Sequence, residues 1–187
     1  MTQHLCKTPQ VNIIGKIKGA YNFEYQTAYV KYSFKVGENW TLVSGIHEGD
    51  TFQSTSSHNK YIPLDHPFDL NYASKSLRGW PKLFIEVWLI DSYGRNSLGG
   101  YGIIGLPMAS GFYKLDIPCW RPKSTFSDYI IGAHPELIHR DILIASDSRF
   151  NFKTESTGNI QVEIDILNKD FGLHGVQLQD KEIDDME

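Results

Sequence analysis

Apolar and polar residues alternate along several stretches of the chain. Residues 160–166 place an Ile or Val at every second position, with Gln161, Glu163 and Asp165 between them. Residues 30–36 repeat this pattern with two lysines and a serine at the intervening positions. A period of two turns one set of side chains toward a core and the other toward water, as in a β-strand with one buried face. The pattern therefore predicts strands over both segments.

The segment 82–90, KLFIEVWLI, is apolar on both faces apart from Glu86, which predicts a more central strand. Gly, Pro, Asn and Ser clusters separate further expected strands, at 11–18, 67–73, 101–107 and 112–117 and, more briefly, within 149–154. No segment carries a sustained 3.6-residue apolar stripe, and at most one or two short helices are expected, within 124–139. Many short strands with few helices predict an all-β, antiparallel sandwich of about eight strands.

Composition and charge limit the number of domains and the kinds of partner that the chain is expected to have. The chain has 187 residues, 41% of them apolar, which is enough for one core and predicts a single domain. Residues 179–187 hold five acids and one lysine, so they account for the whole net charge of −4 and leave a neutral body. A neutral body does not favour nucleic acid as a partner. No apolar run is long enough to span a membrane, and the first ten residues lack the apolar stretch of a signal peptide, so a reducing compartment is expected.

Residues 100–105, GYGIIG, spell the G-x-G-x-x-G of a dinucleotide-binding loop. That loop requires a strand directly before it and a helix directly after it, whose N-terminal amides hold the pyrophosphate. Here a polar stretch, SYGRNSLGG, separates it from the preceding strand, and Pro107 would break a helix in its first turns. We therefore expect the glycines to mark a strand entrance, and we expect no cofactor.

Histidines near carboxylates are the remaining candidates for catalysis. His134 and His139 are five residues apart, which is a rotation of about 140° on a helix, so they are poor joint metal ligands. His47 and His66 lie near acidic residues and allow a general acid–base pair. The favoured alternative is that Asp50, Asp65 and Asp69 serve turns and caps. We predict no catalytic residue and no metal site.

Two segments resemble the calcium-binding loops of C2 domains. One is the run from Val87-Trp88 through an acidic position to Gly105-Leu106-Pro107, and the other is 15–34, GKIKGAYNFEYQTAYVKYSF. Calcium requires six to eight oxygen ligands. The loop positions are degenerate, however, with Thr27, Leu89 and Ser97 in place of acids, and only Asp91 is retained. Calcium binding is therefore not expected, and Asp91 is expected to cap the turn DSYG.

A narrower resemblance covers about residues 11–178. It is to the B9 domain, a C2-related module of ciliary transition-zone proteins, and rests on four segments: 79–107, 111–122, 136–142 and 158–176. The most specific parts are Gly79-Trp80-Pro81 and Gly100-Tyr101-Gly102. Residues 66–81, Cys119-Trp120-Arg121-Pro122 and the ending Phe171 to Val176 point to one of three paralogous B9 proteins. The expected domain is therefore 11–178, with flexible ends at 1–10 and 179–187.

The B9 resemblance implies assembly without catalysis. It implies a structural subunit of the ciliary transition-zone (Meckel/tectonic-like) complex, needed for cilium assembly and for the gate that controls membrane-protein entry. The implied partners are B9 domain-containing protein 1 and the Meckel syndrome type 1 protein, with this chain as the middle member. The implied location is the cytoplasmic side of the cilium base, at the transition zone or basal body, in association with the cytoskeleton.

Aromatic and arginine side chains are the candidate partner contacts, because such residues carry much of the energy of interfaces. Tyr93 and Arg95 are placed at a loop tip, and Trp120 and Arg121 lie between prolines. Burial of Trp120 as a loop anchor is an equal alternative. For Trp80 and Trp88, burial in the core is favoured.

Calcium-independent binding of phosphoinositides or membranes is the alternative function. Lys31 and Lys35 share the face of their strand opposite Val30, and Lys16 and Lys18 alternate similarly on the first strand. Each lysine near an anionic membrane surface adds about 1 kcal/mol. Lysines are also common on ordinary solvated strands.

Overall fold

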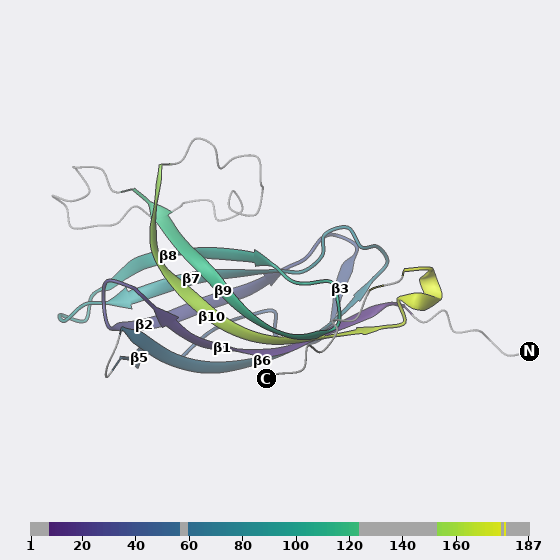
Figure 1. Ribbon diagram of the computed structural model, residues 1–187, viewed down its shortest axis with the longest axis horizontal. Helices are drawn as coiled ribbons and strands as arrows, with labels where there is room; N and C mark the ends of the chain where they lie inside the picture. The colour runs from purple at the N-terminus through teal and green to yellow at the C-terminus, as the bar shows by residue number, and fades with distance from the viewer. Residues whose placement is uncertain (1–7, 57–59, 124–152, 177, 179–187) are drawn as a thin grey trace, which may run out of the picture.

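The structure, a computed structural model, describes residues 8–56, 60–123, 153–176 and 178 (Figure 1). These residues form ten β-strands and one short 3-10 helix. In chain order they are β1 (Gln10–Tyr21), β2 (Thr27–Lys35), β3 (Trp40–Gly45), β4 (Glu48–Asp50), β5 (Ser54–Thr55), β6 (Tyr61–Ser74), β7 (Lys82–Ile90), β8 (Asn96–Gly105), β9 (Gly111–Pro122), β10 (Thr154–Lys169) and η3 (Gly172–His174).

The strands form one antiparallel sheet that folds back on itself. Its order is β3-β6-β1-β10-β9-β8-β7-β2-β4, and β5 pairs with β2. Between β8 and β9 the ladder narrows to the single pair Tyr101–Trp120, so the sheet bends there into two layers. Figure 1 shows the long strands β1, β6, β9 and β10 curving along one layer. The predicted all-β antiparallel C2-like fold is confirmed; the three shortest strands, β3, β4 and β5, were not predicted.

The predicted strands are found, and most are longer than expected. The segment 82–90 is β7 with the expected bounds, and it pairs with β2 on one side and β8 on the other. β6 begins at Tyr61 and not at 67. β8 begins at Asn96 and not at 101, because Asn96 already pairs with Ile90 across a tight turn. The expected nine-residue loop is therefore wrong. Residues 100–105 lie inside β8 and not at its entrance, and no helix follows them.

The core lies between the two layers. Ile13 and Ile17 of β1 and the Ile and Val side chains of 160–166 in β10 face Val30 and Phe34 of β2 across it, and all of these are buried. Burying an Ile or Phe side chain fully contributes about 1.5–3 kcal/mol. The alternation noted in the sequence is thus the alternation between this core and the outside. Cys119 of β9 is also buried, and burial raises the pKa of its thiol to about 12.

A second cluster occupies the opposite face of β7 and β8. Phe84, Leu98 and Tyr101 are buried there, with Trp88, Ile103 and Trp120 partly buried against them. Trp80 is in the main core as predicted, with its ring 5.2 Å from that of Trp40 in an edge-on arrangement. Trp88 is only half-buried, so the core assignment is wrong for it. It lies on the face of β7 opposite Val87 and Leu89, which are in the main core, and its ring stacks on that of Tyr29 with 6.4 Å between the ring centres.

Several predictions lie outside the described residues. These are the helices within 124–139, the histidines at 134 and 139, most of the short strand within 149–154, and residues 1–7 and 179–187 of the two expected flexible ends. Gln10, which was assigned to the first of these ends, is already part of β1. The helix that the structure describes, η3, was not predicted. It follows Phe171 and ends at His174, and the next residue, Gly175, caps it with a positive φ of 75°. No helix among the described residues is long and apolar enough to cross a membrane.

Candidate interaction surfaces

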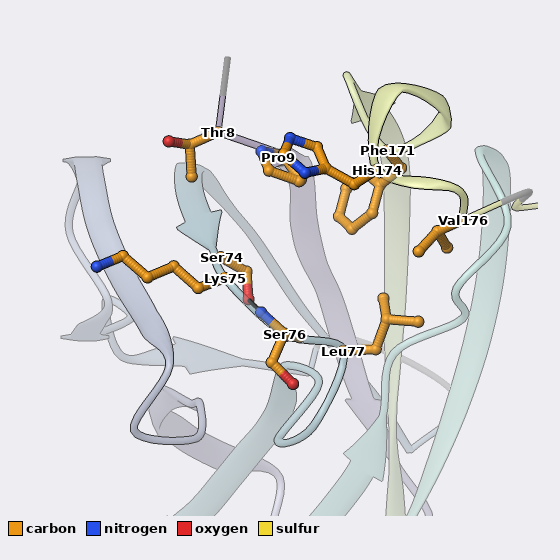
Figure 2. A pocket seen from close by; sticks show the side chains of 9 residues that line it. All are labelled: Thr8, Pro9, Ser74, Lys75, Ser76, Leu77, Phe171, His174 and Val176. Carbon is orange, nitrogen blue, oxygen red and sulfur yellow. Dashed lines mark hydrogen bonds between the residues drawn. The ribbon is translucent and has the colours of Figure 1, made fainter. Parts of the chain in front are cut away.

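A cavity of about 470 Å³ opens where the start of β1, the end of β6 and η3 meet (Figure 2). Its lining is largely apolar, with Leu77, Phe171 and Val176 among the walls and Lys75 and His174 as the basic members. No Asp or Glu is among the described residues that line it. The described residues that line the cavity therefore supply no carboxylate for acid–base chemistry of the kind considered for His47 and His66.

The histidine sites considered from the sequence lie away from this cavity. His47 is exposed between β3 and β4. His66 is half-buried on β6, where its Nε2 lies 3.3 Å from the hydroxyl of Tyr32, and burial lowers its pKa. His66 thus acts as a neutral packing and hydrogen-bonding group beside the aromatic ring of Tyr32.

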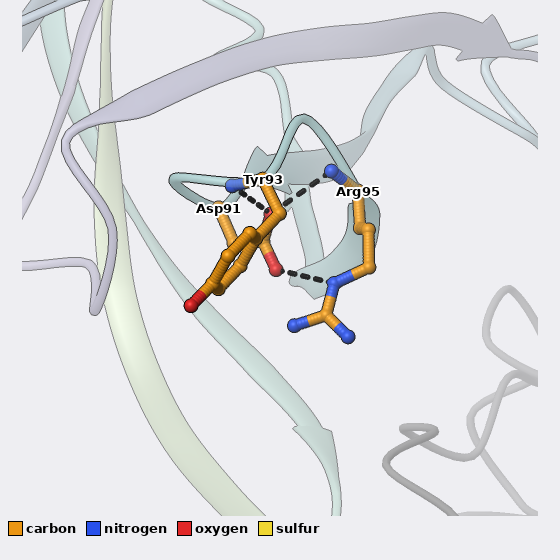
Figure 3. A network of polar contacts seen from close by, with 3 residues as sticks. All are labelled: Asp91, Tyr93 and Arg95. Atoms are coloured by element: carbon orange, nitrogen blue, oxygen red, sulfur yellow. Dashed lines mark hydrogen bonds and ion pairs between the residues drawn. The ribbon is translucent and has the colours of Figure 1, made fainter.

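The turn between β7 and β8 is built around Asp91 (Figure 3). One carboxylate oxygen, Oδ1, accepts hydrogen bonds from the backbone N–H groups of Tyr93 at 2.8 Å and Arg95 at 2.9 Å. The backbone closes the same turn, since Gly94 N–H donates to the carbonyl of Asp91 at 3.0 Å. The predicted turn-capping role of Asp91 is confirmed. A short polar side chain that binds the backbone two residues onward is a common way to fix a turn.

The side chains on this turn are held in place and yet exposed. The Nε of Arg95 donates to Asp91 Oδ2 at 2.7 Å, and the guanidinium carbon lies 5.3 Å from the centre of the Tyr93 ring. Tyr93 is 83% exposed and the Arg95 side chain 75% exposed. In Figure 3 the two terminal nitrogens of Arg95 point away from Asp91. The turn therefore presents an aromatic ring and a guanidinium group that are already ordered in the free protein. Little further conformational entropy would be lost if a partner bound them.

The charge of Asp91 is committed to this turn. The backbone N–H of Arg95, together with its side chain and the N–H of Tyr93, holds the pKa of Asp91 below its ordinary value. Its side chain is only 10% exposed. Asp91 is thus ionised at neutral pH, with both oxygens already accepting hydrogen bonds.

The other three positions that were compared with calcium loops lie near Asp91. Thr27 pairs with Ile90, and Leu89 pairs with Ser97, so the tertiary structure gathers them at one end of the sheet. Leu89 is buried in the core, and the Thr27 hydroxyl lies 3.0 Å from that of Thr55. Among the described residues, no group of three or more His, Cys, Asp or Glu side chains gathers in a way that could hold a metal ion.

Trp120 and Arg121 both form contacts within the chain. Trp120 packs against the second cluster with its ring 6.1 Å from that of Tyr101, in the middle of β8. Arg121 is paired within the chain, since its Nε donates to Glu155 at 2.6 Å and its Nη1 lies 3.7 Å from Glu24. These contacts give both residues a structural role at the bend between the layers.

The four candidate lysines are divided between the two layers. Lys16 and Lys18 lie on the outer face of β1, and both contact Asp65, at 3.6 and 3.9 Å. Lys31 and Lys35 lie on the outer face of β2, on the opposite side of the sandwich. The structure therefore does not assemble them into one basic patch.

One exposed apolar segment was missed by sequence reasoning. Val43 within β3 is 54% exposed, and Ile46, the residue just after the strand, is 71% exposed. The run WTLVSGI, residues 40–46, contains no charged residue and no proline. That absence was the available signal, but the run is too short and irregular for a period of two to identify it as a strand.

Comparison with known proteins agrees with this architecture. The family model described as "Ciliary basal body-associated, B9 protein", B9-C2, matches residues 11–167. The antiparallel sheet of ten described strands and this match over most of the chain define a C2-related protein, and the chain belongs to the B9 family.

The chain is also similar to individual members of this family. The chain is 35% identical to B9 domain-containing protein 2 of Bos taurus over 172 residues, which cover 90% of this chain and 98% of the bovine protein. It is 34% identical to the human protein of the same name, with the same coverage. It is 28% identical to B9 domain-containing protein 1 of Xenopus laevis, over 86% of this chain and 84% of that protein. Among solved structures it is similar to a C2 domain of plant Extended Synaptotagmin 1, with 12% identity, a TM-score of 0.43, and coverage of 87% of this chain and 95% of that one.

Proposed function

We propose that this chain is a non-enzymatic structural subunit of the ciliary transition-zone complex, which supports cilium assembly and the gate for membrane-protein entry. The observation that carries this proposal is the similarity to proteins named B9 domain-containing protein 2 along nearly their whole length. In this proposal residues 11–178 form the B9 domain, and the protein acts at the cytoplasmic side of the cilium base, associated with the cytoskeleton.

The partners in this proposal are B9 domain-containing protein 1 and the Meckel syndrome type 1 protein, with the present chain between them. Tyr93 and Arg95 are the contact residues at one partner's interface. An exposed ring and guanidinium held by Asp91 suit this role, because a preorganised anchor loses little freedom on binding. A middle subunit also requires a second, separate surface, and each stable interface covers about 800 Å² of this chain.

Co-purification of the full chain with both partners tests the proposal. Wild type is expected to bring down both proteins, and Tyr93→Ala or Arg95→Ala is expected to weaken binding of one partner by roughly 10- to 30-fold. Ser92→Ala is the matched control, because Ser92 is exposed on the same turn. A wild-type chain that stays monomeric in the presence of both proteins contradicts the proposal.

Membrane binding is the second candidate, and it rests on the outer face of β2 and β7. Lys35 pairs directly with Lys82 there, and Lys31 lies two positions along the same face. Flotation with phosphoinositide vesicles tests it. Salt-sensitive binding that is lost in a Lys31→Glu/Lys35→Glu variant supports this function, and absence of binding by wild type excludes it.

A further inference from the structure

Strand β3 forms a free edge of the sheet. It pairs with β6 along one side, from Trp40–Ser74 to Gly45–Leu70, and it stands at the end of the strand order. No other described strand pairs with its opposite side. An edge strand of this kind presents a row of backbone N–H and C=O groups that a further strand can pair with.

The two edges of the sheet differ in their protection. The other edge, β4, is three residues long, and two of these are the acids Glu48 and Asp50. Short length and charge are devices by which proteins block unwanted strand pairing. By contrast, β3 has six residues, and its run 40–46 is uncharged with Val43 and Ile46 exposed. Its one irregularity is a register shift between Leu42 and Ser44.

Charges at the two ends of β3 indicate what can pair with it. Glu38 lies two residues before the strand, and Glu48, the first residue of β4, lies three residues after it. Both are exposed, and neither forms an ion pair with another described residue. If two copies of the chain paired antiparallel along β3, the end of the strand that follows Glu38 in one copy would lie beside the end that precedes Glu48 in the other. Like charges brought together in this way oppose self-association, whereas Lys or Arg at the ends of a foreign strand would be attracted.

The position of β3 leaves the Tyr93–Arg95 turn free. Trp40 is anchored at the beginning of β7, since its Nε1 donates to the carbonyl of Arg78 at 2.9 Å. The turn lies at the other end of β7, after Ile90. Figure 1 shows β3 and the β7–β8 turn toward opposite ends of the long axis of the molecule. A protein paired to β3 therefore need not cover the turn.

We infer that β3 is the second partner surface, where an extended strand of another protein adds to the sheet by β-augmentation. The occupant is a strand with a largely uncharged centre and with Lys or Arg at its ends. This inference rests on the proposed function, because it assigns the second of the two surfaces that a middle subunit needs.

The test uses the full chain with both proposed partners and a pair of substitutions at one site. Val43→Lys places a charge on the edge, and Val43→Thr keeps a β-branched, uncharged side chain of similar size. We expect Val43→Lys to lose one partner and retain the other, Val43→Thr to retain both, and Tyr93→Ala to lose the partner that Val43→Lys retains. Circular dichroism melting checks that both Val43 variants remain folded.

Hydrogen exchange distinguishes a partner strand that is hydrogen-bonded to β3 from a partner that only lies near it. In the complex with wild type, the amides of residues 40–46 are expected to become protected, and this protection is absent when the partner lost by Val43→Lys is left out. Reversal of both end charges, by Glu38→Lys with Glu48→Lys, is expected to weaken the same partner only.

Each other outcome counts against a specific statement. If the wild-type complex forms and Val43→Lys retains both partners, the inference about β3 is wrong and the proposed function stands. If wild type binds neither protein, the proposed function fails and the inference with it. If wild type alone is a dimer that Val43→Lys converts to a monomer, the occupant is a second copy and the foreign strand is excluded.

Discussion

The β7–β8 turn and the β3 edge are both exposed, but they are prepared for contact in opposite ways. In the turn, Asp91 accepts two backbone N–H groups and the Arg95 side chain, so the polar groups are satisfied within the chain. What remains for a partner is the outer surface of Tyr93 and Arg95. In β3 the side chains are uncharged, and one whole backbone edge has no described strand beside it. The first region offers side-chain recognition and the second offers backbone pairing, so they suit different partners.

The largest expected effect is on the free energy of unfolding, and it should differ between β3 and the β7–β8 turn. Trp40 begins β3, is buried against Trp80, and donates a hydrogen bond to Arg78. Trp40→Ala should therefore lower the free energy of unfolding by about 3–5 kcal/mol. Tyr93→Ala removes only an exposed ring and should change it by less than about 0.5 kcal/mol. Urea denaturation of both variants checks this, and equal midpoints would mean that β3 is not anchored through Trp40.

A smaller effect is expected from two glycines that share a backbone conformation. Gly79, before β7, has a φ of 74°, and an added Cβ would clash with the Cα of Gly37, which lies shortly before β3. Gly94, in the turn, has a φ of 78° and nothing within 4 Å of an added Cβ. Gly94→Ala should cost about 1–2 kcal/mol through its left-handed backbone, whereas Gly79→Ala adds a clash of the new methyl group with the backbone of Gly37. A thermal melt in which Gly94→Ala is the less stable variant would contradict this ranking.

The smallest effect is a pH dependence confined to the turn. The folded-state pKa of Asp91 lies below its ordinary value of 3.8, so its contribution is complete above that value and is lost as the pH falls through the lowered pKa. The amide resonances of Tyr93 and Arg95 should shift with a midpoint below 3.8. Amides of residues 40–46 should not follow this titration, because the run contains no ionisable side chain. Asp91→Asn is the control, and a shift that persists in it would assign the titration to another group.

The alternation of apolar and polar residues predicted the long strands, because burial of one face requires an apolar side chain at every second position. The period of two in β2 and β10, and the two-sided apolar run of β7, follow from which faces touch the core. The start of β8 and the strands β3 to β5 could not be predicted in this way. Asn96 joins β8 only because Asp91 closes the turn opposite Ile90, and β3 is a strand because β6 lies beside it.

The environment of the candidate contact residues was also predicted only in part. Tyr93 and Arg95 were proposed because aromatic and arginine residues at a loop tip are suited to binding, and both are exposed at such a tip. Arg121 lies next to an aromatic residue in the sequence, as Arg95 lies close to Tyr93. It is paired within the chain, however, with Glu155 on the neighbouring strand. The lysines of β1 and β2 alternate alike in sequence, and only the folding of the sheet places them on opposite outer faces.

By itself, the sequence determined the all-β class, the faces of the long strands and the capping role of Asp91, and its motifs identified the B9 family. These features depend on residues that are neighbours along the chain or on patterns within one segment. The tertiary structure decided which exposed groups are already paired, that β3 ends the sheet, and that the turn and this edge lie far apart. These depend on strand neighbours distant in sequence, because backbone pairing and ion pairing are satisfied across strands and not along them.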